Sequence, residues 1–234
     1  MSAATLPVLP ENPGWLARWR TGMQCLLILK DDPANPEAGA LVNEALDLPA
    51  YVERIPELQA DPDGRRILAE RPSLQAEDLD LEALAALPEG TLGHELAAYY
   101  ARMGIAPFTT RQATEKTEEY ISKRYRETHD IYHVVTGYGV DVVGEMELQA
   151  FCMGNIGIRS PRLMLPFGFL GARLSDEFIG AAIGESKVGI GEYYARVYRA
   201  YKRGQRARLM LSVPFEDHWE RPVTELRAEL IDEH

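Results

Sequence analysis

The chain has 234 residues, of which 46% are hydrophobic and 26% charged, and its formal net charge at pH 7 is -11. This size and composition suit one globular domain, and two cysteines are too few for a disulfide framework. The acidic balance excludes the broad basic face that a nucleic-acid-binding protein needs, so we expect no nucleic-acid partner.

The first half of the chain is predicted to be helical after a short arm. Residues 1–14 include three prolines and are predicted to form an irregular N-terminal arm, with residues 15–234 forming a single helical domain. Apolar residues then recur at helical spacing, and Pro49 is expected to end the second helix. The predicted helices cover residues 15–29, 40–48, a short stretch within 61–72, 79–87 and 94–104.

The second half continues the helical pattern. Long helices are predicted over 115–135 and 141–154, followed by an irregular Gly- and Pro-rich stretch at 154–173. One or two further helices are expected over 175–204, and a short helix ends the segment 214–230. Because convincing strand alternation is absent, the fold class is predicted to be all-α, with irregular Pro- and Gly-rich connections.

Neither a membrane span nor a targeting segment is evident. The strongly apolar stretch at 163–172 is too short to cross a bilayer and contains Pro166. The first basic residue is Arg18, which fits neither a secretory signal nor an Arg-rich transit peptide. We therefore expect a cytoplasmic and bacterial protein.

The helix predicted over 115–135 has one apolar side. With about 100° of rotation per residue, Ile121 shares a stripe with the residues four, seven, eleven and fourteen positions later. Those residues are Tyr125, Thr128, Tyr132 and Val135. The stripe is expected to pack against the rest of the domain.

Two histidines and an acid lie beside that stripe. His129 and His133 are four residues apart, so their side chains lie one above the other, an arrangement in which a helix can hold one metal ion. Asp130 falls on the same face, where it could ligate directly, orient a histidine or act as a base.

Glu145 follows His133 by twelve residues. On one straight helix it would lie about 18 Å away, whereas ligands of a shared ion lie about 2 Å from its centre. The chain must therefore turn between them for both to bind one ion. Gly137 and Gly139 stand in the gap, and glycine permits the sharp change in backbone direction.

Other interpretations compete with a metal site. Histidines at helical spacing also occur on ordinary surfaces or in packed cores, so spacing alone leaves the question open. Zinc proteases have Glu directly after the first His, where this chain has Asp130. HD-type phosphohydrolases share the His-Asp pair but need further ligands, and His94, His218 and His234 show no pattern that supplies them.

The segment HDIYHVVTGYGVDVVGE fits the pattern HDxxH, eleven residues, then Glu. It resembles the Coq-four family of ubiquinone (coenzyme Q) biosynthesis proteins. DPDGRRILAERP, LPEGTLG, RYRET and the terminal WE and ELRAEL segments also resemble the family and fall in the right order. The resemblance covers roughly residues 20–231.

The resemblance implies an all-helical, metal-dependent ubiquinone biosynthesis protein. It implies a divalent metal, zinc above all, held by His129, Asp130, His133 and Glu145, with Asp130 also the candidate catalytic residue. The implied substrate is a polyprenylated benzoate or quinone precursor, oxidatively decarboxylated at ring carbon one. A non-catalytic scaffold that binds prenyl lipid and organises other quinone-biosynthesis enzymes is the alternative.

Residue chemistry adds three expectations. Two histidines and a carboxylate suit zinc, and equally iron or another redox metal. Arg126 shares the metal face, where it could bind a substrate carboxylate or simply be a solvated surface residue. Residues 151–174 mix apolar residues with helix breakers, and residues 192–208 place six basic residues among four tyrosines. Either segment could contact lipid, although a buried connection and a solvated helix face remain open.

The resemblance also implies how the protein is placed and assembled. A prenylated substrate would require peripheral association with the inner face of the cell membrane. The family further implies a homo-oligomer and contact with other enzymes of quinone biosynthesis. None of these partners follows from the residues alone.

Overall fold

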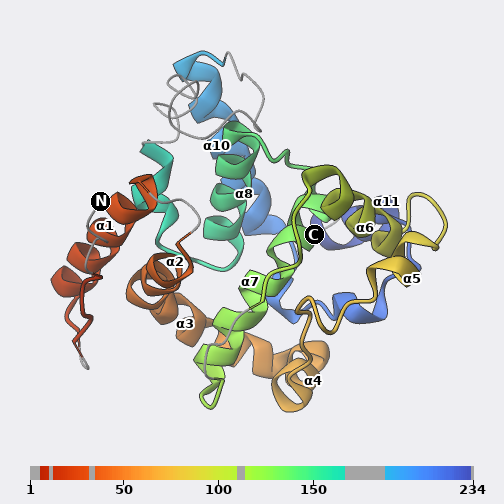
Figure 1. Ribbon diagram of the computed structural model, residues 1–234, viewed down its shortest axis with the longest axis horizontal. Coiled ribbons are helices and arrows are strands. Elements are labelled where there is room, and N and C mark those ends of the chain that lie inside the picture. The colour runs from red at the N-terminus through yellow and green to blue at the C-terminus, as the bar shows by residue number, and fades with distance from the viewer. Residues whose placement is uncertain (1–5, 11–12, 32–34, 110–113, 167–187, 233–234) are drawn as a thin grey trace.

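The computed structural model describes residues 6–10, 13–31, 35–109, 114–166 and 188–232 (Figure 1). Within these ranges the regular structure is helical, and the sole β-type pairing there is an isolated bridge between Thr91 and Pro222. The all-α prediction is thus confirmed. None of the helices in the described ranges combines the length and hydropathy needed to cross a membrane.

Two helices and a π-helical turn pack together near the N-terminus. Helix α1 (Trp15–Asp31) lies against α2 (Pro36–Val42) and the turn η1 (Asn43–Asp47). A small apolar cluster separate from the main core holds them together. Its fully buried members include Cys25, Ala38, Ala45 and Leu46.

The prediction that Pro49 ends a helix is wrong. The chain stays helical from α2 through η1 into α3 (Leu48–Ala60), with Pro49 inside the first turn of α3. Proline has no N–H for the carbonyl four residues earlier, which belongs to Ala45. The Arg18 side chain donates to the carbonyls of both Glu44 and Ala45 at 3.2 Å, so a partner from another helix serves the carbonyls that precede the proline.

Three short helices lead from α3 to the centre of the molecule. They are α4 (Pro62–Glu70), α5 (Leu81–Ala85) and α6 (Leu92–Met103), close to their predicted positions. Asp61 begins α4 by accepting from the backbone N–H groups of Asp63 and Gly64, as an N-cap residue does.

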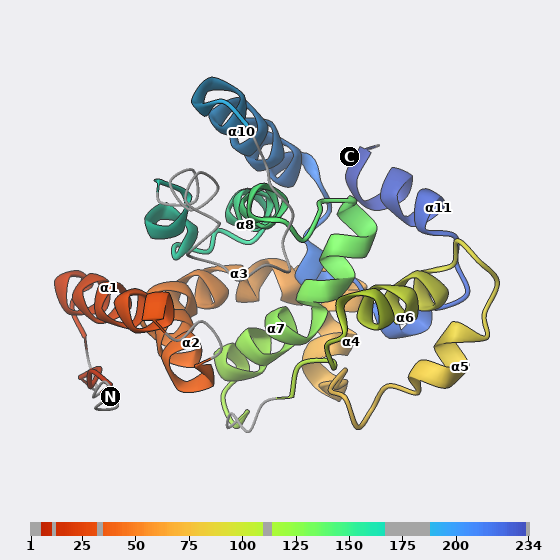
Figure 2. The same cartoon turned by 45° about the horizontal axis from the view of Figure 1, so that its top comes forward.

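Helix α7 (Thr117–Thr136) runs through the middle of the fold (Figure 2). It contacts α3, α6 and α11, and its predicted stripe of five residues from Ile121 to Val135 is buried in the main core. The stripe prediction is confirmed. Helix α8 (Val142–Asn155) follows after a tight turn.

Helix α8 pairs closely with α10 (Ile190–Arg206). Glycines make the approach possible, because a Cβ at Gly154 would lie 2.2 Å from the Tyr201 carbonyl and one at Gly204 would lie 2.1 Å from the Phe151 carbonyl. Residues 161–166, predicted to be irregular, are helical. The predicted helical segment 175–187 and the rest of the irregular stretch, 167–173, lie outside the described residues.

The C-terminal segment closes the core. Two 3₁₀ turns, η2 (Met210–Ser212) and η3 (Phe215–Asp217), precede α11 (Val223–Arg227) and a final π turn, η4 (Ala228–Asp232). The predicted C-terminal helix is confirmed. Asn155 fastens this segment to α8, since its side chain donates to the Arg208 carbonyl at 2.9 Å and accepts from the Met210 N–H at 2.9 Å.

Candidate metal centre

Helix α7 places its two histidines side by side. The ring centroids of His129 and His133 lie 5.0 Å apart, with the rings nearly perpendicular. His133 is almost fully buried, whereas the His129 side chain keeps 22% of its surface exposed. The pair therefore sits at the inner end of a recess and still reaches solvent.

The turn between α7 and α8 brings Glu145 to the histidines. Gly137 ends α7 with a left-handed φ of 79°, and Asp141 begins α8 by accepting from the Gly144 N–H at 2.7 Å. A Cβ on Gly144 would lie 2.3 Å from the Gly139 carbonyl, so the turn packs directly on the first turn of α8. The predicted reversal at the paired glycines is confirmed.

Three side chains converge as a result. The Nε2 atom of His133 lies 3.0 Å from Glu145 Oε2, and that of His129 lies 3.5 Å from Glu145 Oε1. In the described part of the chain these three residues form a group whose ligand atoms all lie within 4.8 Å of one another. Two imidazoles and a carboxylate are a donor set that divalent transition metals bind.

The other ring nitrogens face away from the centre. His133 Nδ1 lies 3.1 Å from the Tyr138 carbonyl, to which it can donate, and His129 Nδ1 lies 3.6 Å from Asp130 Oδ1. A proton on each Nδ1 leaves each Nε2 lone pair directed at the centre. Metal-binding histidines are commonly oriented in this way by a carboxylate or a carbonyl.

Asp130 is placed differently from the other predicted ligands. Its carboxylate accepts from the Tyr100 hydroxyl at 3.0 Å and from the Tyr99 hydroxyl at 3.4 Å, on the Nδ1 side of His129. Burial and the charge of Asp130 raise the pKa of Tyr100, which therefore remains a donor. The structure brings together His129, His133 and Glu145, while Asp130 orients one of them.

Gln149 belongs to this site, although the sequence reasoning missed it. It is buried on α8, one helical turn after Glu145. Its amide nitrogen donates to Glu145 Oε1 at 2.8 Å and lies 3.3 Å from His129 Nε2. The four-residue spacing from Glu145, which matches the spacing of the histidines, was the available signal.

The acidic groups at the centre favour the protonated form of His129. Burial opposes a charged His129, but Glu145 and Asp130 raise its pKa to about 10. The pKa of Glu145 is lowered well below its usual value because the histidines outweigh its burial. In the metal-free chain a proton on His129 balances Glu145, and a metal ion would have to displace that proton.

The centre is reached from two sides. A hollow of about 300 Å³ meets His129, Asp130 and Gln149, and its outer wall is largely apolar, including Leu26, Leu29, Val42, Phe108 and Met164. A second hollow of about 450 Å³ approaches His133 and Tyr99 from another direction and is lined by polar groups that include Glu95, Arg102 and Arg227.

Arg126 lines the apolar hollow together with His129 and Asp130. Its guanidinium lies over the Phe108 ring at 5.5 Å, and its Nη2 atom is buried without a hydrogen-bond partner among the described residues. Burial lowers its pKa. Of the predicted site residues, Arg126 thus shares the recess but touches none of the three converging side chains through a hydrogen bond or ion pair within the described ranges.

Comparison with known proteins identifies the family. The family model described as coenzyme Q (ubiquinone) biosynthesis protein Coq4 matches residues 15–233. This chain belongs to the Coq4 family. It is therefore a ubiquinone biosynthesis protein, and the resemblance inferred from the HDxxH segment is confirmed.

Relatives from fungi and an animal agree with that assignment. The chain is 34% identical over 203 residues to the mitochondrial ubiquinone biosynthesis protein COQ4 of Eremothecium gossypii, covering 84% of this chain and 59% of that protein. Identity to the mitochondrial homologue of Danio rerio is 30% over 206 residues, covering 85% of this chain and 70% of that protein. These relatives are named mitochondrial, and the bacterial origin expected from the sequence stays a prediction.

A solved structure shares the fold. The crystal structure of a candidate ubiquinone biosynthesis protein from Nostoc punctiforme superposes with a TM-score of 0.69 and 25% identity. The match covers 91% of this chain and 97% of the other. The overall helical fold therefore recurs in a second protein.

Proposed function

We propose that this chain is a metal-dependent enzyme that acts on a polyprenylated hydroxybenzoate-type precursor of ubiquinone. The proposed reaction replaces the carboxylate on ring carbon one by a hydroxyl group. The observation that supports it best is the convergence of His133, His129 and Glu145, together with a largely apolar hollow that His129 lines.

The residues fit a divalent metal. His129 and His133 would bind through Nε2 and Glu145 through its carboxylate, while Asp130 and the Tyr138 carbonyl hold the imidazole rings. Three protein ligands leave room for a substrate oxygen. Zinc, the metal expected from the sequence resemblance, would act there as a Lewis acid, whereas iron or another redox metal would also supply electron transfer.

The hollow suits a substrate with a charged head and an apolar tail. Its inner end offers Arg126, whose unpartnered Nη2 would bind the ring carboxylate, since a buried donor without a partner costs about 1–3 kcal/mol. Leu26, Leu29 and Met164 at the other end would contact the first prenyl units. The rest of a long tail would extend beyond a hollow of about 300 Å³.

Asp130 would be a positioning residue more than a strong base. Burial opposes ionisation, but His129 and Tyr100 lower its pKa, so it stays ionised at neutral pH and accepts protons weakly. Its place beside His129 Nδ1 keeps Nε2 free for the metal. Gln149 would hold Glu145 and can donate to a phenolic oxygen of the substrate.

The reaction also needs an oxidant. Dioxygen and water balance it without a further reductant: the carboxylic acid carbon leaves as carbon dioxide, the oxygen atom of water becomes the ring hydroxyl, and dioxygen is reduced by two electrons to hydrogen peroxide. The second hollow, beside His133, would give small molecules a route that does not cross the first. This chain spans 59% of the length of the Eremothecium gossypii relative, and the proposed reaction is a proposal for this chain alone.

Metal analysis of the purified chain, coupled to an assay of precursor conversion, tests the proposal. We expect about one metal ion per chain, loss of activity on chelation and recovery when the metal is restored. Arg126→Gln should raise the KM for the carboxylated precursor about tenfold or more without changing metal content. A metal-free chain that still converts the precursor would contradict the proposal.

The alternative role as a prenyl-lipid scaffold makes a different prediction. A scaffold would support normal quinone levels after His133→Ala, provided that the variant still folds and binds lipid. An enzyme would not. Self-association and contact with other quinone-biosynthesis enzymes fit either role and remain proposals.

A further inference from the structure

Helix α10 has one buried face and one exposed row of unusual composition. Tyr193, Val197, Ala200 and Gly204 are buried against the body of the protein. On the other side, residues at four-residue intervals form a row that advances about 24 Å along the helix and winds about 40° per step around its axis, or about 160° in all. From the N-terminal end of α10 the row reads Ile190, Tyr194, Tyr198, Lys202 and Arg206.

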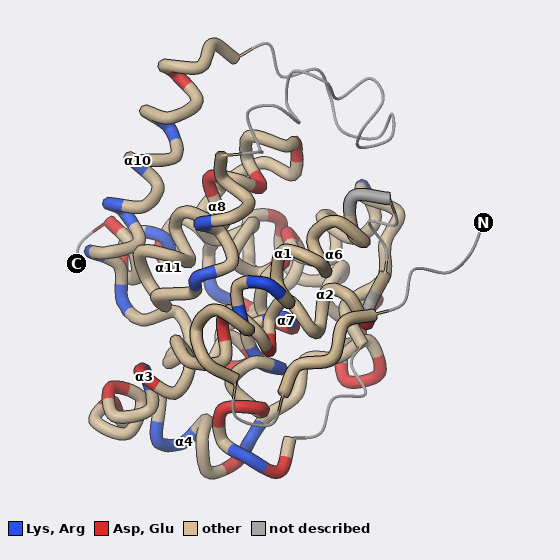
Figure 3. Tube along the Cα trace, turned by 90° about the vertical axis from the view of Figure 1, so that its left-hand side faces the viewer, with Lys and Arg blue, Asp and Glu red and all other residues tan. Residues whose placement is uncertain are grey.

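The N-terminal part of that row is apolar and aromatic. Ile190, Tyr194 and Tyr198 are 55%, 45% and 63% exposed, whereas Tyr193 on the same helix is fully buried. This end of the helix stands out from the body of the protein (Figures 2 and 3). Exposed aromatic side chains with a polar tip favour a boundary between water and an apolar phase.

The C-terminal part of α10 is strongly basic. The helix contains five basic residues and one acid, Glu192, and the basic positions recur along the tube in Figure 3. Two of the five are neutralised, since Arg196 pairs with Glu147 and Arg203 with Asp232. Within the described residues, the other three, Arg199, Lys202 and Arg206, form no ion pair with an acid, although Lys202 donates to Gln205 Oε1 at 2.7 Å.

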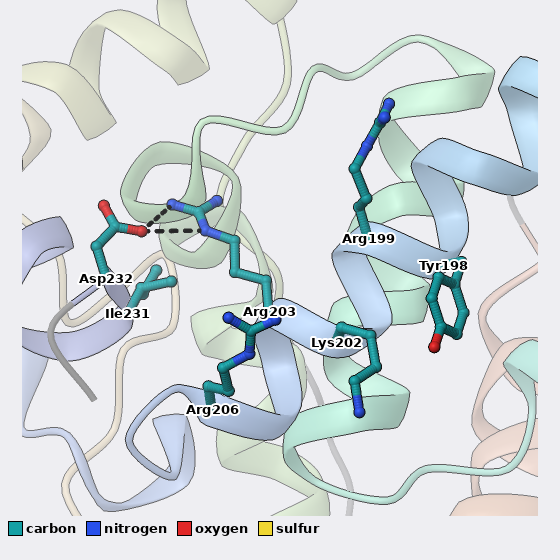
Figure 4. Close-up of a pocket in the computed structure, with 7 residues that line it drawn as sticks. All are labelled: Tyr198, Arg199, Lys202, Arg203, Arg206, Ile231 and Asp232. Atoms are coloured by element: carbon teal, nitrogen blue, oxygen red, sulfur yellow. Dashed lines mark hydrogen bonds and ion pairs between the residues drawn. The ribbon is translucent and has the colours of Figure 1, made fainter.

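These cations surround a hollow of about 370 Å³ between α10 and the end of the chain. Figure 4 shows the Arg203 side chain directed at Asp232, whereas no dashed line joins Arg199, Lys202 or Arg206 to another residue drawn. Repulsion among three neighbouring cations costs stability unless an anion offsets it. The partial negative charge at the C-terminus of the helix stabilises the basic residues of its last turn, Arg203 and Arg206, but this effect does not extend to Arg199.

A bilayer of anionic lipid matches both halves of the row. Its negative head groups complement Lys202 and Arg206, and its interfacial region accepts the neighbouring exposed ring of Tyr198. A nucleic acid would complement the basic residues but has no apolar interior to accept an exposed aromatic side chain such as Tyr198. We infer that the exposed face of α10 formed by Tyr198, Lys202 and Arg206, which lie within about 80° of one another around the helix axis, docks this protein on the surface of an anionic membrane.

The docked helix would also serve the proposed reaction. The Tyr193 hydroxyl donates to the Leu165 carbonyl at 2.7 Å, which ties α10 to the helical segment 161–166. Met164, next to Leu165, lines the apolar hollow at the metal centre. The membrane would then lie near the hollow that is proposed to receive a prenylated ring, and only this part of the inference rests on the proposed function.

Vesicle binding tests the inference without metal or turnover. The whole chain is mixed with vesicles of neutral phosphatidylcholine, or of phosphatidylcholine with phosphatidylglycerol, and the bound fraction is measured by flotation. We expect binding to the anionic vesicles that weakens as salt rises. Lys202→Glu with Arg206→Glu should weaken it by about 30-fold or more, because each basic residue near the surface contributes about fivefold.

A matched control separates a specific surface from net charge. Arg20→Glu with Arg102→Glu changes the net charge by the same amount at exposed positions on α1 and α6, and it should leave vesicle binding nearly unchanged. Circular dichroism melting curves check that all variants are folded. Equal loss in both variants, no binding to anionic vesicles, or binding to heparin alone would each overturn the inference.

Failure here and failure of the proposed function give different results. If the chain binds one metal ion and converts the precursor but does not bind anionic vesicles, the docking surface is rejected and the proposed function is retained. If the chain binds vesicles through α10 but binds no metal, the proposed function is rejected and the docking surface is retained.

Discussion

Charged side chains point in opposite directions at the metal centre and along the exposed row of α10. At the centre, His129, His133 and Glu145 point inward, and each is held by a second group from the protein. Along α10, Lys202 and Arg206 point outward and have no acidic partner within the described ranges. Convergent, restrained groups select a small ion, whereas divergent, flexible groups suit an extended surface.

Of the predicted changes in binding affinity, the largest should follow from removing one ligand of the metal centre. His133→Ala is expected to lower metal affinity by at least about 100-fold, because even residues that only orient a ligand contribute about 10–100-fold. Isothermal titration against a competing chelator measures it. His94→Ala, on the half-exposed face of α6, is the matched control and should leave affinity unchanged. Equal affinities in the two variants would remove His133 from the site.

Removing the group that orients His129 should have a smaller effect. Asp130→Asn is expected to weaken metal binding by about 10–100-fold, and Tyr100→Phe by less, since it removes one hydrogen bond to Asp130. Asp78→Asn, at an exposed turn, serves as the control. A ligand role for Asp130 would instead give a loss as large as that of His133→Ala, together with a changed spectrum of the cobalt-loaded protein.

Metal affinity should depend on pH in a defined direction. The pKa of His129 is raised to about 10, so below that pH the metal must displace a proton, while Glu145 is already ionised. Apparent affinity should rise with pH between 7 and 9, approaching about tenfold per unit for one displaced proton, and level off above pH 10. Chelator competition at each pH, with the measured proton release, checks this. A flat profile would mean that His129 is not a ligand.

The smallest expected effect concerns the apolar end of α10. Tyr198→Ser should lower binding to anionic vesicles by only about threefold to fivefold, because binding scales with the apolar area inserted. Unlike the effect of Lys202→Glu, this loss should persist at high salt, where charge attraction is screened. If the loss disappears at high salt, Tyr198 does not enter the apolar part of the membrane.

The centre was predictable because most of it is local in sequence. The spacing of His129 and His133, the reversal at Gly137 and the return of Glu145 all follow from helical geometry over a short stretch of chain. The same geometry predicted the buried stripe of α7. These features depend on backbone rules that hold in any fold.

The contacts that join distant segments were not predictable. Tyr99 and Tyr100 reach Asp130 from another helix, and Arg18 donates to the carbonyls that precede Pro49. Neither contact follows from the spacing of residues along the chain. They arise when helices pack, and a single sequence does not specify which side chains then meet.

X-ray absorption spectroscopy of the metal-loaded chain tests the central claim most directly, because it reports the atoms bound to the ion. We predict two imidazole nitrogens and at least one carboxylate oxygen at about 2 Å, with one imidazole lost in His133→Ala. An ion surrounded by oxygen atoms alone, or a spectrum unaffected by that substitution, would contradict the account.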